Sequence, residues 1–315
     1  MILSVSRRTD ILAFYLEWFF KRLDEGNVFV RNPMNHRQVS NVELSPAVID
    51  CIVFWTKDPT AILDKLDLLS DYHYYFQITL NDYGKTIERN LTQSDKIIDS
   101  FQKLSARIGS NRTLWRYDPI ILTDKMDISY HCRQFERLAK RLEGFTERCT
   151  ISFFDKYLKT ERNMQGLNQK EADSSIMMDL AKRLNEVAMK HNIRMYSCCE
   201  CIDPGETGVQ HGSCIDGSLI SEIIGQPLKV KNDKNQRSNC GCMESVDIGA
   251  YNTCGFGCRY CYANFSDDFV NNSRLRHDAD SPMLIGNVEP GDKITVRDMR
   301  SLLQTDQETF LIRWR

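Results

Sequence analysis

Hydrophobic positions in the first two hundred residues alternate between two patterns. Short continuous apolar runs are typical of strands buried on both faces, and the segments between them repeat apolar residues every three or four positions, as amphipathic helices do. The runs predict strands at residues 2–5, 51–55, 74–80, 113–117, 150–154 and 193–197. The helical patterns cover residues 11–23, 58–69, 94–108, 128–142 and 170–191, and residues 28–30 and 39–44 predict an inserted hairpin.

This alternation of strands and helices indicates repeated βα units, and therefore an α/β fold with a parallel sheet. Six units in series can form a doubly wound open sheet or an incomplete TIM-like (β/α)6 barrel. We favour the barrel, because polar residues recur where the predicted strands end, and that rim carries the active site in (β/α) barrels. The expected organisation is a barrel core over residues 1–200 and a cysteine-rich metal-binding segment over residues 201–315 that folds back on it.

The polar residues at the strand ends are candidates for lining a substrate pocket. An arginine just inside a buried strand end needs an anionic partner, either a protein carboxylate or a bound ligand. Aspartates at the same places are equally well explained as helix caps or turn residues. The predicted pocket residues are Arg7, Arg8, Lys57, Gln77, Arg116, Tyr117 and Asp155.

The cysteines are concentrated after residue 197, where the regular alternation of strands and helices ends. The chain has 12 cysteines, of which only Cys51, Cys132 and Cys149 precede Cys198, so the other nine lie between Cys198 and Cys261. A disulfide framework would spread over the chain that it staples, whereas this clustering in a region of weak periodicity favours metal binding. The three early cysteines are expected to be ordinary core or surface thiols.

Cys254, Cys258 and Cys261 form the pattern C-x3-C-x2-C, with Gly255 and Gly257 between the first two. The glycines allow a short loop to wrap around a metal cluster. A structural zinc site or an electron-transfer cluster would take four protein ligands. Three thiolates instead leave one iron of a [4Fe-4S] cluster open for chemistry.

This spacing, with Tyr260 directly before the last cysteine, resembles the motif of the radical S-adenosylmethionine superfamily. The resemblance implies a [4Fe-4S] cluster and S-adenosylmethionine, from which reduction yields a 5′-deoxyadenosyl radical that abstracts hydrogen. It also implies that Tyr260 lies near the adenine and that a reductant such as flavodoxin or ferredoxin supplies the electron. In most of that superfamily the loop follows the first barrel strand, but here the strand at residues 2–5 has no cysteine after it. Either the barrel is permuted or the C-terminal segment folds back over the rim.

The wider sequence resembles an uncharacterised bacterial family known as DUF1848, a likeness that implies no particular substrate. The similarity runs through most of the chain and includes the cysteine loop. The segments that carry it are Ser4-Val5-Ser6-Arg7-Arg8-Thr9-Asp10, Phe54-Trp55-Thr56-Lys57-Asp58-Pro59, Arg116-Tyr117-Asp118-Pro119, Lys234-Asn235-Gln236-Arg237, Cys240-Gly241-Cys242, Asp247-Ile248-Gly249 and Tyr262-Ala263-Asn264.

The remaining clustered cysteines suggest a second metal centre, either zinc or an auxiliary iron–sulfur cluster. The predicted ligands are Cys199, Cys214, Cys240 and Cys242. Cys198 is left out because adjacent residues of a strand point to opposite faces. His211 could replace one thiolate, and the alternative is that these cysteines are simply reduced thiols.

The net charge and the hydropathy of the chain argue against two classes of binding partner, nucleic acids and membranes. With 41 basic and 43 acidic residues the formal net charge is -2, so no overall positive field attracts nucleic acid. The basic stretch 229–237 lacks the interleaved aromatics of a nucleic-acid-binding surface. No apolar run approaches the roughly 20 residues that span a bilayer. We expect a cytoplasmic protein with no membrane partner.

The sequence therefore predicts a radical enzyme acting on an unknown small molecule. One alternative is a non-catalytic metal or redox protein, in which the C-terminal cysteines form structural sites. A weaker alternative is a nucleic-acid repair enzyme, since some radical enzymes act on damaged bases. The identity of bound metal separates the first two hypotheses.

Overall fold

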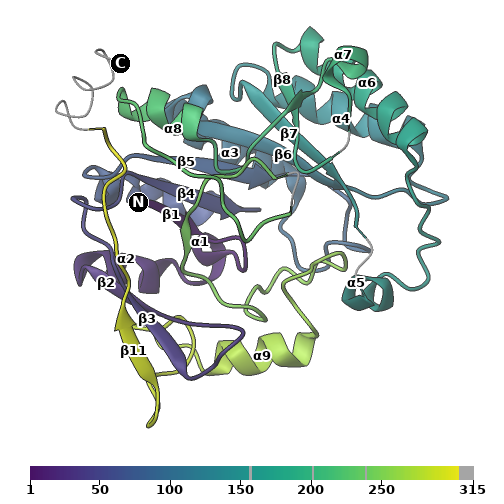
Figure 1. Cartoon of the computed structure of the whole chain (residues 1–315). Coiled ribbons are helices and arrows are strands. Elements are labelled where there is room, and N and C mark those ends of the chain that lie inside the picture. Colours follow the sequence, from purple (N-terminus) through teal and green to yellow (C-terminus); the bar gives the residue numbers. More distant parts are fainter. Residues whose placement is uncertain (156–157, 201, 238–239, 305–315) are drawn as a thin grey trace.

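The centre of the protein is an eight-stranded parallel sheet (Figure 1). The structure is a computed structural model that describes residues 1–155, 158–200, 202–237 and 240–304. The strand order is β10-β1-β4-β5-β6-β7-β8-β9, and every neighbouring pair is parallel. The strands are β1 (Ile2–Val5), β4 (Cys51–Thr56), β5 (Tyr74–Thr79), β6 (Thr113–Ile120), β7 (Arg148–Phe153), β8 (Arg194–Ser197), β9 (Gln210–His211) and β10 (Val246–Asp247).

The sheet confirms the expected α/β fold, but it is open where a barrel would close. From β1 to β9 the central strands follow one another in chain order, and β10 returns to pair with β1. Within the described residues β9 and β10 are the two edges of the sheet and do not pair with each other. The structure thus shows a parallel sheet and no closed barrel.

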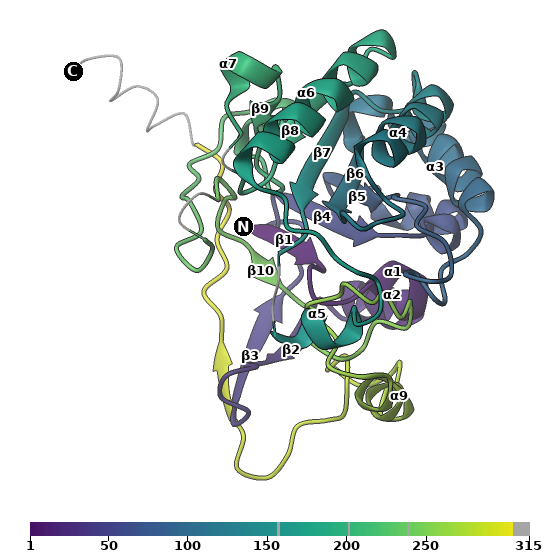
Figure 2. The ribbon, with the colours of Figure 1, turned by 90° about the vertical axis from the view of Figure 1, so that its right-hand side faces the viewer.

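Helices cover one face of this sheet, as Figure 2 shows for α3, α4 and α6. They form because their apolar residues recur at helical spacing and because an aspartate caps several N-termini; Asp127 and Asp173 accept backbone N–H bonds in this way. The helices are α1 (Ile11–Phe14), α2 (Leu16–Asp24), α3 (Ser94–Ile108), α4 (Ile128–Leu142), α5 (Leu158–Asn163), α6 (Ser174–Lys190), α7 (Pro204–Thr207), α8 (Gly217–Ile224) and α9 (Asp267–Leu275). Two 3-10 helices are η1 (Thr60–Leu69) and η2 (Ser110–Arg112).

Two predicted helices differ from the expected form. The segment 11–23 is split at Tyr15, whose backbone leaves the helical region and whose hydroxyl donates to the Thr253 carbonyl at 2.7 Å. The segment 58–69 is a 3-10 helix. None of the helices in the described ranges is long and apolar enough to cross a membrane.

The opposite face of the sheet is covered by the C-terminal third of the chain. Strand residues alternate between the two faces: Trp115 and Tyr117 pack among the helices, whereas Leu114 packs against Leu219 and Ile220 of α8. The core therefore has two layers, and the cysteine-rich segment builds the second one.

A small second sheet also ties distant parts of the chain together. The expected hairpin is confirmed as β2 (Asn27–Arg31) and β3 (Gln38–Glu43), which are antiparallel. Strand β11 (Lys293–Val296) adds to β3 in parallel. The C-terminal segment thus contributes strands to both sheets, and Figure 2 shows β10 beside β1.

A buried histidine should make the helix-covered core sensitive to acid. His131 on α4 has no exposed surface; its Nδ1 lies 2.8 Å from the Tyr117 hydroxyl and its Nε2 2.9 Å from the Ile121 carbonyl. Burial lowers the pKa of His131 from 6.5 to about 4. Between these values the unfolded chain binds a proton that the folded chain does not, so the stability contributed by neutral His131 is lost as the pH falls from 6.5 towards 4.

We expect His131→Gln to remove this dependence. Urea unfolding of both proteins from pH 7 to pH 4 should show their difference in unfolding free energy changing by about 3 kcal/mol. The subtraction removes the contributions of other titrating groups that the two proteins share. A difference that stays constant over this range would contradict the assignment.

Candidate functional site

An isolated antiparallel bridge holds the C-x3-C-x2-C loop against residues 87–91, which follow β5. Glu88 and Cys258 form an antiparallel bridge, and backbone N–H groups donate from Asn90 to Phe256 at 3.0 Å and from Arg259 to Ile87 at 2.9 Å. This pairing places the loop next to the carboxyl ends of β4 and β5. The central strands run in chain order from the N-terminus, so the loop reaches the rim because the C-terminal segment folds back.

Both glycines of the loop are required by the packing around it. Gly257 has φ +63°, a left-handed conformation that side chains rarely adopt. At Gly255 a Cβ atom would lie 2.6 Å from Arg274 Nη1 and 2.8 Å from the ring of Phe14. The sequence argument that these glycines shape the loop is thus supported by their surroundings.

The three thiols of the loop lie near one another and are half-buried. Cys254 Sγ accepts hydrogen bonds from the backbone N–H groups of Phe256 and Asp10. Burial raises the pKa of Cys254 to about 12 and that of Cys258 well above its usual range, and the neighbouring thiols add to both shifts. Three such thiols become thiolates when a metal cation compensates their charge.

A buried ion pair lies beside Cys258. Lys57 Nζ contacts Glu88 Oε1 at 2.7 Å, and the Tyr260 hydroxyl donates to the same oxygen at 2.5 Å. The backbone N–H of Tyr83 donates to Glu88 Oε2 at 3.3 Å. Burial disfavours the charge on Lys57, but the charges of Glu88 and Cys258 outweigh it and raise the pKa of Lys57.

The carboxylates closest to these thiols are therefore already engaged. Besides Glu88, Asp10 accepts from the backbone of Ala13 at 3.0 Å, from the Thr56 hydroxyl at 3.0 Å and from the backbone of Lys57 at 2.7 Å. Burial raises the pKa of Asp10 to about 7. Both side chains are thus engaged with other donors, which leaves the three thiols as the candidate ligands of this loop.

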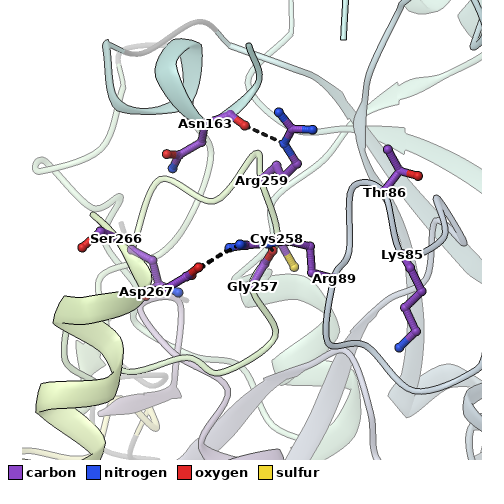
Figure 3. Close-up of a pocket in the computed structure, with 10 residues that line it drawn as sticks. Lys85, Thr86, Arg89, Asn163, Gly257, Cys258, Arg259, Ser266 and Asp267 are labelled. Atoms are coloured by element: carbon purple, nitrogen blue, oxygen red, sulfur yellow. Dashed lines mark hydrogen bonds and ion pairs between the residues drawn. The ribbon is translucent and has the colours of Figure 1, made fainter. Parts of the chain in front are cut away.

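A pocket of about 430 Å³ opens beside the loop (Figure 3). Its basic side chains are Lys85, Arg89 and Arg259, and its acidic residue Asp267 pairs with Arg89 at 2.7 Å. The residues that line it are Lys85, Thr86, Arg89, Asn163, Gly257, Cys258, Arg259, Asn264, Ser266 and Asp267.

Asn264 carries an unused hydrogen-bond acceptor at this pocket. Its Nδ2 donates to the Cys254 carbonyl at 2.8 Å, but its Oδ1 is buried without a partner. A buried carbonyl oxygen without a donor is costly, so such an atom next to a pocket indicates a place for a ligand N–H or O–H group.

The structure brings only some of the predicted pocket residues to this loop. Lys57 and Tyr260 meet at Glu88, as described. Arg7 and Arg8 instead face acidic residues of the C-terminal segment: Arg7 Nη2 lies 3.7 Å from Asp233, and Arg8 Nε lies 3.9 Å from Asp247. The anionic partners that these arginines require are thus protein carboxylates.

Gln77 and Arg116 point to the other cysteine group. Gln77 Nε2 donates to the Cys214 carbonyl and Arg116 Nη1 to Cys214 Sγ, both at 2.8 Å, and Arg116 also pairs with Asp118 at 2.6 Å. Tyr117 was predicted to line the pocket, and this was wrong. Neighbouring residues of a strand point to opposite faces, so Tyr117 points into the helix-covered core while Arg116 points to Cys214.

Asp155 lies apart from these groups. It is exposed and pairs with Arg237 at 2.6 Å, so the structure does not place it in the pocket beside the cysteine loop. Asp155 was predicted to line the pocket because it follows β7, but a strand-end position did not bring it there.

A second group of thiols lies where the sequence predicted a second centre. Cys198 Sγ lies 3.0 Å from Cys214 Sγ. The side chain of Cys198 also interacts with Cys199, that of Cys240 with Cys199 and Cys242, and that of Cys242 with Cys214. Cys198 was left out on the condition that the strand continues through Cys199, and the structure does not meet that condition. Strand β8 ends at Ser197, and Cys199 has φ +59°, so the alternation of a strand does not extend to this pair.

Neither thiol group is already arranged as a metal site. In the described ranges no three or more His, Cys, Asp or Glu side chains are positioned as the ligands of a metal ion. Glu88 and Asn264 were not predicted as site residues from the sequence. Glu88 lies in a loop beyond β5 and is not part of a recognisable sequence motif. The role of Asn264 depends on the pocket, which only the structure shows.

Comparison with known proteins identifies the family. The model for a domain of unknown function (DUF1848) matches residues 2–263. The chain belongs to the DUF1848 family. No curated protein matches it.

Among solved structures, this DUF1848 protein is similar to a putative alpha-L-fucosidase from Bacteroides thetaiotaomicron VPI-5482. The two are 10% identical, and the match covers 57% of this chain and 73% of that one with a TM-score of 0.21. That value is too low to carry an argument about fold or activity.

Removing one partner of the Lys57–Glu88 pair should be costly. The side chains are 13% and 1% exposed, so Lys57→Met leaves a buried carboxylate without its cation. We expect a loss of about 3–5 kcal/mol in the free energy of unfolding, measured with urea on protein without added iron.

The double variant Lys57→Met/Glu88→Gln supplies the control. It removes the stranded charge along with the cation, so it should be clearly more stable than Lys57→Met alone. Equal stability of the single and double variants would show that the unpaired charge of Glu88 does not cause the loss of stability in Lys57→Met.

Proposed function

We propose that this DUF1848 protein is a radical S-adenosylmethionine enzyme whose [4Fe-4S] cluster is held by Cys254, Cys258 and Cys261. One observation carries the proposal: three neighbouring thiols sit in a backbone-clamped loop while the nearest carboxylates, Asp10 and Glu88, are saturated by other donors. A three-ligand site of this kind fits a cluster with one iron left for a substrate.

When bound, the cluster and S-adenosylmethionine supply a one-electron reductive cleavage that yields a 5′-deoxyadenosyl radical for hydrogen abstraction. The protein's own groups position and enclose the site. Backbone N–H groups of Phe256 and Asp10 aim at Cys254 Sγ and would lower the electron density on that sulfur. The Lys57 ammonium beside Cys258 places a positive charge next to the anionic centre.

The pocket beside the loop is our proposed S-adenosylmethionine and substrate site. Three basic side chains against one acidic residue favour an anionic group such as a carboxylate. Asn264 Oδ1 provides an acceptor for an amino or hydroxyl group. The electron would come from a small reductant protein such as flavodoxin or ferredoxin. We also infer that the open sheet derives from an incomplete TIM-like barrel, because its strands follow in chain order.

The first test is the cleavage reaction itself. Protein reconstituted anaerobically with iron and sulfide, then reduced with dithionite, should form 5′-deoxyadenosine from S-adenosylmethionine. Its electron paramagnetic resonance spectrum should also change when the cofactor is added. Product is quantified by chromatography.

The triple variant Cys254→Ala/Cys258→Ala/Cys261→Ala should reduce product to the level without protein. Cys132→Ser, which alters a half-buried thiol on α4, serves as the matched control and should behave as wild type. Product formed by the triple variant would show that the cleavage does not need this loop. Zinc without iron in wild type would favour a non-catalytic metal protein instead.

A second test concerns Asn264. Asn264→Ala removes the buried acceptor and should weaken S-adenosylmethionine binding about tenfold, equivalent to about 1.4 kcal/mol. Titration calorimetry on reconstituted protein measures the affinity. Iron content is determined in parallel, because Asn264 also donates to the Cys254 carbonyl. Unchanged affinity at normal iron content would remove Asn264 from the site.

A further inference from the structure

The second thiol group is a closed ring of five side chains. In order around the ring they are Cys198, Cys199, Cys240, Cys242 and Cys214, each interacting with the next, and Cys198 Sγ lies 3.0 Å from Cys214 Sγ. The ring joins the residues that follow β8, the start of the chain towards α8, and the segment before β10. Three separate parts of the chain thus meet through sulfur atoms.

Burial distinguishes four of the five cysteines. Cys214 and Cys242 are buried, and Cys198 and Cys240 pack against the same apolar cluster, which includes Leu219 of α8. Cys199 is not part of this cluster. The four that share it are consecutive in the ring, in the order 198, 214, 242, 240.

We propose that Cys198, Cys214, Cys240 and Cys242 bind one zinc ion, and that Cys199 is a neighbouring thiol without a metal bond. This assignment replaces Cys199 in the set predicted from the sequence with Cys198. It is independent of the cluster proposed at Cys254, Cys258 and Cys261.

The contact between neighbouring sulfurs favours a single metal ion. Zinc bound tetrahedrally by four thiolates at about 2.3 Å places adjacent sulfurs roughly 3.8 Å apart, which is contact distance. Thiolates of a [4Fe-4S] cluster each bind a different iron and lie farther apart. Binding of one zinc ion would release the protons of the four thiols and would require their sulfurs to turn towards a common centre.

The surroundings supply what an anionic tetrathiolate centre needs. The guanidinium of Arg116 lies in the buried layer and donates to Cys214 Sγ at 2.8 Å. The backbone N–H of Ile215 donates to Cys242 Sγ, and that of Cys242 to Cys240 Sγ. Such donors to ligand sulfurs orient them and disperse their charge.

The sheet also fixes the backbone at the centre of the ring. The hydroxyl of Tyr75 and Nε2 of Gln77 both donate to the Cys214 carbonyl at 2.8 Å. The zinc ion would therefore anchor the C-terminal segment to the sheet face that no helix of residues 1–200 covers.

The experiment measures zinc, iron and sulfide in full-length protein purified anaerobically from medium containing both metals. We use the triple variant Cys254→Ala/Cys258→Ala/Cys261→Ala as the background, so that the other loop contributes no iron. Single changes to serine at Cys198, Cys199, Cys214 and Cys242 are added, with Cys132→Ser as the matched control.

One zinc per chain is expected in the background protein, in Cys132→Ser and in Cys199→Ser, with at least a fivefold loss in the Cys198, Cys214 and Cys242 variants. Added chelator should also make the background protein, but not the zinc-free variants, more sensitive to limited proteolysis. Iron and sulfide in place of zinc would overturn the choice of metal. Zinc lost in Cys199→Ser but kept in Cys198→Ser would overturn the ligand assignment, and absence of all metal would overturn the site. None of these outcomes depends on 5′-deoxyadenosine formation.

Discussion

A parallel sheet must be covered on both faces, and this requirement explains most of the structure. The helices between the central strands cover only one face. On the other face Ile2, Val53 and Tyr75 would meet water if the C-terminal third did not lie over them. That third has little regular structure of its own, and the short helix α8 with the cysteine-rich segments completes the layer. Of the two thiol groups, the one with Cys214 and Cys242 belongs to this layer, whereas Cys254 and Cys258 pack against the helix-covered cluster.

Buried charge connects the two thiol groups. Arg116 contacts Cys214 and Asp118, while Lys57, which interacts with Asp118, contacts Glu88 next to Cys258. Ions that are taken out of water need close partners, and here each cation has a carboxylate and a sulfur nearby. The strand-end positions of Arg116 and Lys57 thus serve the sulfur sites, whether or not a substrate also meets them.

Local patterns in the sequence were sufficient for the sheet and the main helices. Residues 94–108 and 128–142 were predicted to be helical and form α3 and α4 with the same bounds, because their apolar spacing and capping act within the segment. Local patterns could not show whether the sheet closes into a barrel, because closure requires pairing between the two edge strands, β9 and β10. The glycine-flanked cysteine loop was also visible, as a motif of fixed spacing.

The rest of the candidate site depends on contacts between residues far apart in the chain. Glu88 has no distinguishing neighbours in sequence, yet it meets Lys57 and Tyr260 from two other segments. Cys198 was excluded by strand alternation, which fails because the strand ends one residue earlier. Tyr117 and Arg116 are adjacent, and only the register of β6 decides which of them faces the sulfur atoms.

The antiparallel bridge between Glu88 and Cys258 has a consequence for the order of assembly. Its two residues are about 170 positions apart in the chain. Contacts between such distant residues form late, because closing a long loop costs more entropy than local contacts do. During synthesis the sheet face with Ile2, Val53 and Tyr75 must wait uncovered until the cysteine segments emerge. The yield of folded protein would then depend on whether the C-terminal segment covers that face faster than chains aggregate through it. Until that face is covered, the thiols are exposed to oxidation.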